Sequence, residues 1–168
     1  MHKPTLVAVD TNFPVLLAKG DDDAQEALQV VRRRLRPVQI IIPPTVAEEL
    51  ARHAENDRDP VLSRLALTAL QRLETKWRFL PASLTSVQEA IVEEAVRRLR
   101  HSGLVPYPER NDAAVIAESA VLYSVLLVSN DSHLLAVDHR RLGLLFRELD
   151  LPVPLIISPR EVVKKFYR

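Results

Sequence analysis

The chain has 168 residues, 47% of them apolar, and a formal net charge of +1, which suits one globular domain with a sizeable core. It has no cysteine, so disulfide bridges and thiolate metal sites are excluded and a reducing cytoplasm is a compatible location. No apolar run reaches the ~18 residues of a membrane span, no secretory signal is evident, and the near-neutral charge predicts no global attraction to nucleic acid.

The first predicted element is an apolar, β-branched run from Thr5 to Val9 that ends at Asp10. This pattern is typical of a strand buried on both faces in the centre of a parallel sheet. Asp10 then lies at the carboxyl end of the strand, where ligands bind in open α/β sheets. A turn or a helix cap is the alternative role for this residue.

The segment between residues 21 and 42 is predicted to form a helix and then a second strand. The aspartates at 21–23 provide an N-cap and first-turn acids for a helix that runs to about Arg36. Pro37 ends this helix because proline forces the preceding residue towards an extended conformation. The mainly β-branched residues 39–42 form the second strand.

The following helix starts near Pro44 and carries two adjacent glutamates. Thr45 and Glu48 have the spacing of a capping box, in which each side chain satisfies a backbone N–H group of the first turn. This assignment gives Glu48 a structural task. Glu49, one position further on, is then the carboxylate left for function.

The stretch from about residue 52 to 101 is predicted to carry two long helices separated by a short strand. Pro60 suits the first position of the first helix, and Ser86 with Glu89 has the spacing of a second capping box. The expected ranges are 53–59 for a polar loop, 60–76 and 86–101 for the helices, and 77–80 for the strand.

Asn111 is predicted to cap a helix that begins at Asp112 and continues with small residues to Ala120. Small side chains allow such a helix to lie close to the sheet. The fourth strand, Val125–Val128, repeats the pattern of the first because it also leads to a carboxylate, Asp131.

Three further features complete the chain. Ser132 is expected to cap a short helix that ends near His139. A last strand is predicted at 154–157, and Ser158 and Glu161 form a third capping box at the start of a terminal helix.

The repeated alternation of strands and helices predicts an α/β fold with a parallel sheet and helices on both faces. With right-handed crossovers, the first and fourth strands are central neighbours, and the winding direction reverses between them. Asp10 and Asp131 therefore leave the same edge of the sheet. Asp112 and Glu49 lie near helix starts at that edge, so all four carboxylates are expected to face one cleft.

Four carboxylates cannot all stay ionised in one cleft without compensation, because like charges raise one another's pKa. No lysine or arginine follows them closely enough in sequence to be an evident partner. A divalent cation is the simplest compensation, and Mg²⁺ or Mn²⁺ prefers carboxylate and water oxygens. Water bound to such a cation becomes a better nucleophile for attack on phosphorus.

The sequence resembles the PIN domain family over nearly its whole length. The motifs that carry the resemblance, in the expected order, are Val9–Asn12, Pro44–Leu50, Asn111–Asp112 before an alanine-rich helix, and Leu127–Asp131. The resemblance implies a metal-dependent nuclease with a three-layer αβα sandwich around a five-stranded, mostly parallel sheet. It implies catalytic and metal-binding roles for Asp10, Glu49, Asp112 and Asp131, and supporting roles behind the metal for Asn12 and Ser129.

The function implied by the resemblance is endonucleolytic cleavage of single-stranded RNA with Mg²⁺ or Mn²⁺. Some compact family members are toxin ribonucleases of toxin–antitoxin pairs and many members dimerise, so an antitoxin protein and a second copy of the chain are further expected partners. The helical stretch at about 52–101 departs from the compact members. It is interpreted as an expanded arm of one nuclease domain that spans residues 1–168.

Two alternatives stay open at this point. Asp10 could be the nucleophile of a phosphatase or phosphotransferase. The haloacid-dehalogenase pattern, however, requires a second aspartate where Asn12 stands. The chain could also be a catalytically inactive PIN-fold module that binds RNA or a protein.

Other residues are secondary candidates. Glu118, in the helix of Asp112, is interpreted as solvated or accessory. His133 could contact substrate, although a structural role is commoner at a helix start, and Tyr107 is a candidate for contact with nucleic acid. Clusters of basic residues predict either phosphate contacts or solvated helix ends, and they lie at 32–36, 97–101 and 139–141.

Overall fold

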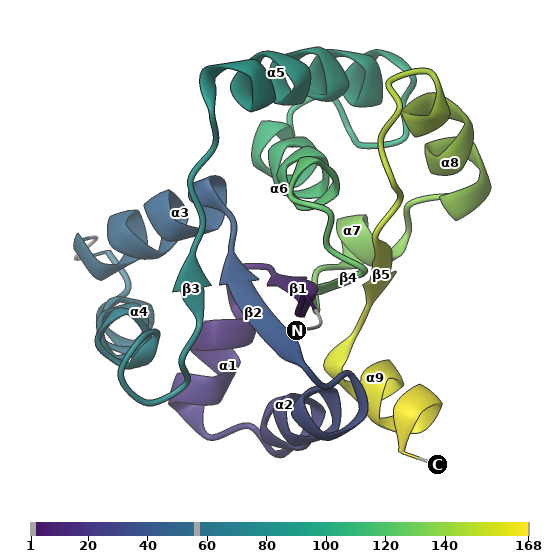
Figure 1. Cartoon of the computed structure of the whole chain (residues 1–168). Helices are drawn as coiled ribbons and strands as arrows, with labels where there is room; N and C mark the ends of the chain where they lie inside the picture. Colours follow the sequence, from purple (N-terminus) through teal and green to yellow (C-terminus); the bar gives the residue numbers. More distant parts are fainter. Residues whose placement is uncertain (1–2, 56–57, 168) are drawn as a thin grey trace.

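The computed structural model describes residues 3–55 and 58–167. Its five-stranded sheet has the order β3-β2-β1-β4-β5, and every strand pair is parallel. The strands are β1 Thr5–Val9, β2 Val38–Ile42, β3 Leu80–Pro81, β4 Leu126–Val128 and β5 Leu155–Ile157. β1 and β4 are central neighbours, as predicted, so the winding direction reverses between them (Figure 1).

Helices cover both faces of the sheet, which makes the fold a three-layer α/β sandwich (Figure 1). One layer contains α1 Asn12–Lys19, α2 Asp22–Arg34, α3 Pro44–Glu55, α4 Pro60–Arg72 and α9 Pro159–Phe166. The other contains α5 Ser86–His101, α6 Arg110–Val121, α7 Ser132–Leu135 and α8 His139–Arg147. Right-handed crossovers produce this division because the chain moves in opposite directions on the two sides of β1. Within the described part of the chain, no helix has both the length and the apolar character that crossing a membrane requires.

The helices α2 and α9 begin where the sequence predicts. The carboxylate of Asp21 accepts the N–H of Ala24 at 2.9 Å and caps α2. Ser158 and Glu161 form the predicted capping box of α9, with Pro159 at the first helical position. These starts are predictable because all the interacting groups lie within three residues of one another.

Three other helix starts differ from the predicted capping residues. Thr85 and Gln88 form the capping box of α5, one residue before the predicted pair. Asp131 rather than Ser132 caps α7, and α6 has no side-chain cap, so Asn111 does not have the predicted role. The errors at α5 and α7 are shifts by one residue, because several polar side chains suit an N-cap almost equally well.

Three further differences concern the presence or the boundaries of elements. The sequence pattern does not predict α8, which Asp138 caps. The polar stretch 53–59, expected as a loop, begins with the last turn of α3, and its residues 56–57 lie outside the described part of the chain. Trp77 and Phe79 precede β3 instead of forming it, and both side chains are buried in the core.

The helix α6 is buried along most of its length. Ala113 and Ala117 are fully buried, and Val7 and Val9 of β1 are only 1% exposed. This packing holds the first turn of α6, which contains Asp112, near the carboxyl ends of the central strands.

Candidate active site

The carboxyl ends of β1 and β4 meet at one edge of the sheet and place Asp10 beside Ser129. The N–H of Asp10 donates to the carbonyl of Val128 at 2.9 Å, which continues the pairing of the two strands. The Asp10 carboxylate is 7% exposed and accepts the Ser129 hydroxyl and the N–H of Thr11, both at 2.8 Å. These bonds fix its orientation at the end of the strand.

Asn12 links the two strand ends. Its Nδ2 donates to Asp10 Oδ2 at 3.1 Å and to Ser129 Oγ at 3.3 Å, and its Oδ1 accepts the N–H of Asn130 at 2.9 Å. Ser129 Oγ also accepts the N–H of Asp131 at 3.0 Å. Asn12 and Ser129 therefore position both aspartates through one hydrogen-bond network.

Asp131 has a structural task that involves only one of its oxygens. Its Oδ1 accepts the N–H groups of His133 and Leu134 at 2.8 and 3.2 Å, and neither bond uses Oδ2. The Asp131 charge raises the pKa values of both Asp10 and Asp112, so this carboxylate lies near both.

The adjacent glutamates of α3 point to different surroundings. Glu49 is half-buried, and its charge raises the pKa of Asp10. Glu48 is exposed, and its charge acts on Glu118 instead. Glu49 Oε1 also lies 3.5 Å from Nε2 of His53, one helical turn further on. The structure thus brings Glu49, and not Glu48, to the strand ends.

The predicted capping box of Thr45 and Glu48 is wrong. Glu118 of α6 accepts the Thr45 hydroxyl at 2.7 Å and the Thr45 N–H at 3.1 Å. Glu118 is only 5% exposed, so it is not solvated, and burial raises its pKa although the two bonds from Thr45 lower it. Thr45 and Glu49 lie one turn apart on α3, so this contact anchors the helix that carries Glu49.

Asp112 belongs to a cluster with two residues outside the predicted set of acids. The ligand atoms of Glu109, Asp112 and His133 all lie within 4.8 Å of one another. His133 Nδ1 is 3.7 Å from Asp112 Oδ2 and 3.9 Å from Glu109 Oε1. Glu109 is the N-cap residue of α6, three positions before Asp112, and this short spacing is the sequence signal that identifies Glu109.

The carboxylates at this edge destabilise one another's charged forms. The pKa of Asp10 is raised to about 6, chiefly by burial and to a smaller extent by the charges of Glu49 and Asp131. The hydrogen bonds from Ser129 and Thr11 oppose this rise. The carboxylate is therefore held in place by groups that stabilise its charge, in surroundings that disfavour that charge.

The charged form of Asp112 is disfavoured more strongly than that of Asp10. The pKa of Asp112 is raised to about 7, chiefly by burial and then by the charges of Asp131, Asp10 and Glu109, while His133 opposes the rise. The structure therefore brings all four predicted acids into one electrostatically coupled group.

A family model described as PIN domain matches residues 7–140. The chain belongs to the PIN domain family. The matched region contains Asp10, Glu49, Asp112 and Asp131. PIN domains are nucleases, so membership of the family supports a phosphodiester-cleaving enzyme.

Among solved structures, this PIN domain is similar to a chain in the crystal structure of VapBC2 from Rickettsia felis bound to a DNA fragment from their promoter. The TM-score is 0.63, the sequence identity is 15%, and the match covers 92% of this chain and 98% of the other. At this identity the similarity shows a shared fold. No curated protein matches the sequence significantly.

Tyr107, the candidate for contact with nucleic acid, is engaged within the PIN domain. The guanidinium carbon of Arg100 lies 4.1 Å from its ring centroid, and Arg100 Nε donates to the Tyr107 carbonyl at 2.7 Å. The ring of His101 meets it edge-on at 6.3 Å. The arginine therefore covers one face of the ring, although the side chain is 60% exposed.

Proposed function

We propose that this PIN domain is a divalent-metal-dependent endonuclease that cleaves single-stranded RNA, and that residues 1–168 form one nuclease domain. The observation that carries the proposal is the coupled group of Asp10, Glu49, Asp112 and Asp131. These acids come from the ends of β1 and β4 and from α3 and α6. Among the contacts within residues 3–55 and 58–167, one histidine lies beside Glu49 and another beside Asp112.

The donor set fits a hard divalent cation. It consists of carboxylate oxygens, which are the ligands that Mg²⁺ and Mn²⁺ prefer, and the chain has no cysteine to offer a thiolate. A cation at this place would relieve the repulsion that raises the pKa values of Asp10 and Asp112. Asp10 and Asp131 would hold it most directly, and Asp112 and Glu49 would complete the site directly or through water.

Neighbouring residues of the chain fix the orientation of the acidic side chains. Ser129 and Asn12 hold Asp10 and Asp131 at fixed places, so both carboxylates keep their geometry while substrate enters and leaves. The bond from Glu118 to α3 fixes the approach of Glu49. When bound, a divalent cation activates water and stabilises negative charge on phosphate oxygens.

The decisive experiment is cleavage of a mixed single-stranded RNA pool by the full chain with Mn²⁺ or Mg²⁺, beside EDTA. Asp10→Asn is expected to reduce cleavage by roughly 1000-fold or more, since it removes a ligand that contributes several kcal/mol in the transition state. The amide has the same size, so the circular dichroism spectrum should be unchanged. Asp23→Asn, at an exposed aspartate of α2, is the matched control and should cleave normally. Mn²⁺-dependent cleavage by a clean Asp10→Asn preparation would contradict the proposal.

A toxin role is the second candidate, and the similarity to a VapBC2 chain favours it. In that case the same nuclease would be inhibited by an antitoxin protein, and it could act as a homodimer. Expression of the native chain alone should then arrest bacterial growth, whereas Asp10→Asn should not, and co-expression of the neighbouring gene should restore growth. A calorimetric titration that detects no binding of Mn²⁺ would instead favour an inactive module that binds RNA or protein.

A further inference from the structure

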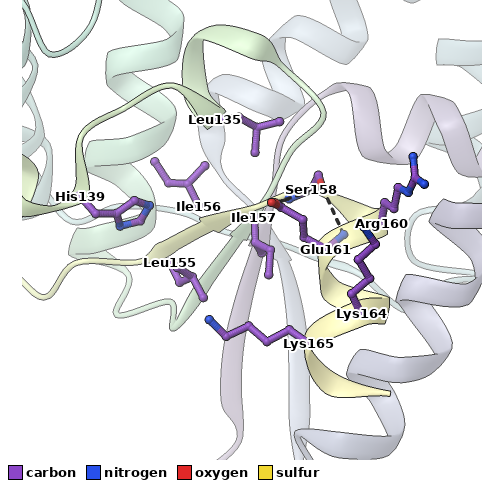
Figure 2. Close-up of a pocket in the computed structure, with 10 residues that line it drawn as sticks. All are labelled: Leu135, His139, Leu155, Ile156, Ile157, Ser158, Arg160, Glu161, Lys164 and Lys165. Carbon is purple, nitrogen blue, oxygen red and sulfur yellow. Dashed lines mark hydrogen bonds between the residues drawn. The ribbon is translucent and has the colours of Figure 1, made fainter. Parts of the chain in front are cut away.

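A pocket lies along the open edge of the sheet, on the β5 side (Figure 2). Its lining comes from the end of α7, the start of α8, the whole of β5 and the first turns of α9. β5 is the last strand in the sheet order, so one of its two edges pairs with no other strand. The floor of the pocket is apolar, and basic side chains surround it (Figure 2).

Two short paths connect this pocket to the carboxylates of the proposed active site. The N–H of Ser129, whose hydroxyl holds Asp10, donates to the carbonyl of Ile157 at 3.0 Å. Neighbouring strands are about 5 Å apart, so this pocket residue lies one strand from Ser129. The helix α7 begins after Asp131 and ends at the pocket residue Leu135, a rise of about 6 Å. The pocket therefore begins so near the carboxylates that a bound nucleic-acid strand would span the gap with a few nucleotides.

Three cations of α9 give the pocket an excess of positive charge. Arg160, Lys164 and Lys165 are exposed, and none of them forms an ion pair within residues 3–55 and 58–167. The one carboxylate of the lining is Glu161, and it is bound to the N–H and the hydroxyl of Ser158, both at 3.2 Å. Arg160 and Lys164 lie one helical turn apart, a spacing at which like charges destabilise a helix. A bound anion would relieve that repulsion.

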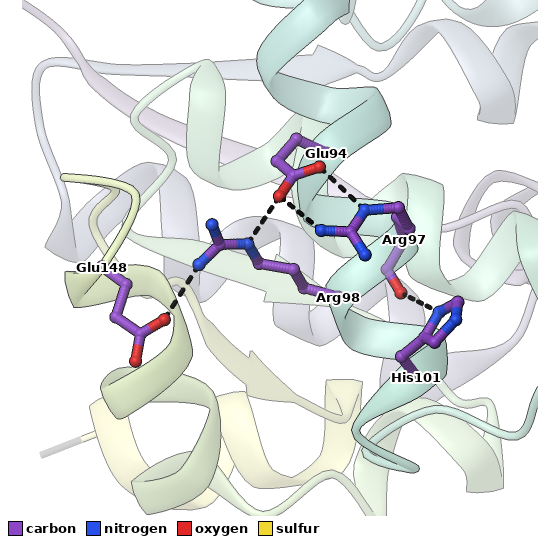
Figure 3. Close-up of polar contacts among 5 residues, drawn as sticks. All are labelled: Glu94, Arg97, Arg98, His101 and Glu148. Atoms are coloured by element: carbon purple, nitrogen blue, oxygen red, sulfur yellow. Dashed lines mark hydrogen bonds and ion pairs between the residues drawn. The ribbon is translucent and has the colours of Figure 1, made fainter.

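Arginines in two other regions bind groups of the protein itself. Arg97 and Arg98 lie 2.8 and 2.7 Å from Glu94 Oε1 (Figure 3). Arg34 donates to the carbonyl of Tyr167 at 2.8 Å. The cations of the β5 pocket have no comparable partner among the described residues, so their charge is available to a ligand.

We propose that the β5 pocket is a phosphate-binding subsite that holds the backbone of the RNA strand beside the bond to be cleaved. This inference rests on the proposed nuclease function. Arg160 offers a planar fork that matches phosphate oxygens, and Lys164 and Lys165 act as compact point charges. Contacts of this kind fix the register of a strand without reading its base sequence.

The geometry favours nucleic acid over a peptide at this edge. An extended peptide would add to β5 through backbone hydrogen bonds, but β5 has only three residues and offers few of them. The cations instead lie on α9, beside the strand, where they can follow a charged backbone that leads away from the acids.

The test measures binding separately from cleavage. All proteins carry Asp10→Asn so that the strand stays intact, and the affinity for a fluorescent single-stranded RNA is measured by anisotropy over a series of salt concentrations. Arg160→Ala/Lys164→Ala is expected to weaken binding about tenfold and to reduce the slope of log K against log salt by about 1.4, since each phosphate contact on a single strand contributes about 0.7. Arg64→Ala/Lys76→Ala removes an exposed arginine and an exposed lysine that lie outside the pocket and outside the three basic clusters, and it is expected to change neither quantity.

The possible outcomes test the phosphate-binding subsite and the nuclease function separately. Equal affinity and slope in the pocket variant and its control would overturn the phosphate-binding subsite, while cleavage by the chain that retains Asp10 would still uphold the nuclease. Loss of affinity in the pocket variant together with no cleavage by the native chain would uphold the subsite and reject the nuclease. Binding of hexaglutamate to the native chain, lost on Arg160→Ala/Lys164→Ala, with no binding of RNA, would show a site for an acidic peptide and overturn the inference.

Discussion

Two groups of charged side chains in this PIN domain have opposite electrostatics. At the strand ends, the pKa of Asp10 is raised to about 6 and that of Asp112 to about 7. On the surface of α5, hydrogen bonds from Arg97 and Arg98 lower the pKa of Glu94 to about 2 (Figure 3). Both groups are rich in charge, but only the second contains a partner for each charge.

The difference lies in the surroundings of each carboxylate. Glu94 is in contact with water and with two guanidinium groups, and Arg98 continues to Glu148 at 2.9 Å, which links α5 to α8. Asp10 is 7% exposed and has other carboxylates as its charged neighbours. Uncompensated charge at low exposure, and not the number of charges, therefore distinguishes the candidate active site from an ordinary polar surface.

The largest expected effect is a loss of stability of the metal-free chain as pH rises. The folded-state pKa values of Asp10 and Asp112 exceed the ordinary value of 3.8, so the folded chain binds more protons than the unfolded chain between about pH 4 and 7. The resulting stabilisation is present below pH 4 and is lost as pH rises through 6 and 7. At 1.36 kcal/mol per pKa unit the two shifts set an upper limit of about 6 kcal/mol between pH 4 and 8, and solvent screening at the partly exposed Asp112 reduces it. Urea denaturation in EDTA should therefore show that the free energy of unfolding falls by at least about 3 kcal/mol over this range.

Asp112→Asn is the control for this effect. The variant lacks one of the two titrating groups, so its pH dependence should be weaker and it should be more stable than the native chain at pH 8 without metal. Mn²⁺ at about 100 times its Kd should stabilise the native chain at pH 8 by about 2.7 kcal/mol. An identical pH dependence in both proteins would show that Asp112 titrates as an ordinary aspartate.

An intermediate effect is expected at the anchor of α3. Glu118→Ala leaves the N–H and the hydroxyl of Thr45 without their acceptor and should lower the free energy of unfolding by about 2 kcal/mol. Glu118→Gln keeps an acceptor oxygen and the side-chain volume, so its loss should be smaller. Urea denaturation measures both, and calorimetry should show weaker Mn²⁺ binding in Glu118→Ala because Glu49 lies one turn away. Equal stability of the two variants would mean that the buried contact does not anchor α3.

The smallest effect is expected in the surface network. Glu94→Gln should shift the thermal midpoint by less than about 2 °C, because exposed ion pairs are solvated and hold long side chains in one geometry. The difference from the native chain should shrink near 0.5 M NaCl, because salt weakens the attraction between exposed charges. Glu89→Gln, at an exposed glutamate of the same helix, is the control. A loss as large as that of Glu118→Ala would contradict the contrast between the two groups.

Local patterns in the sequence determined the order of the elements and the place of the candidate site. Apolar runs that stop at Asp10 and shortly before Asp131 predict two buried strands, and the alternation with helices predicts their parallel pairing and the switch point between them. These features are predictable because burial on both faces and helix capping depend on residues a few positions apart. The catalytic roles of the four acids stay predictions of the sequence and the family.

Only the tertiary structure decided which polar groups meet. Glu118 caps α3 across 73 positions, His133 joins Asp112, and the basic side chains of α9 come to lie beside the strand ends. No local preference encodes these contacts, because burial and hydrogen-bond partners arise only when helices from distant parts of the chain pack on one sheet. The same packing places the acids in low exposure near one another, and that proximity, absent from the sequence, raises their pKa values and prepares the edge for a cation.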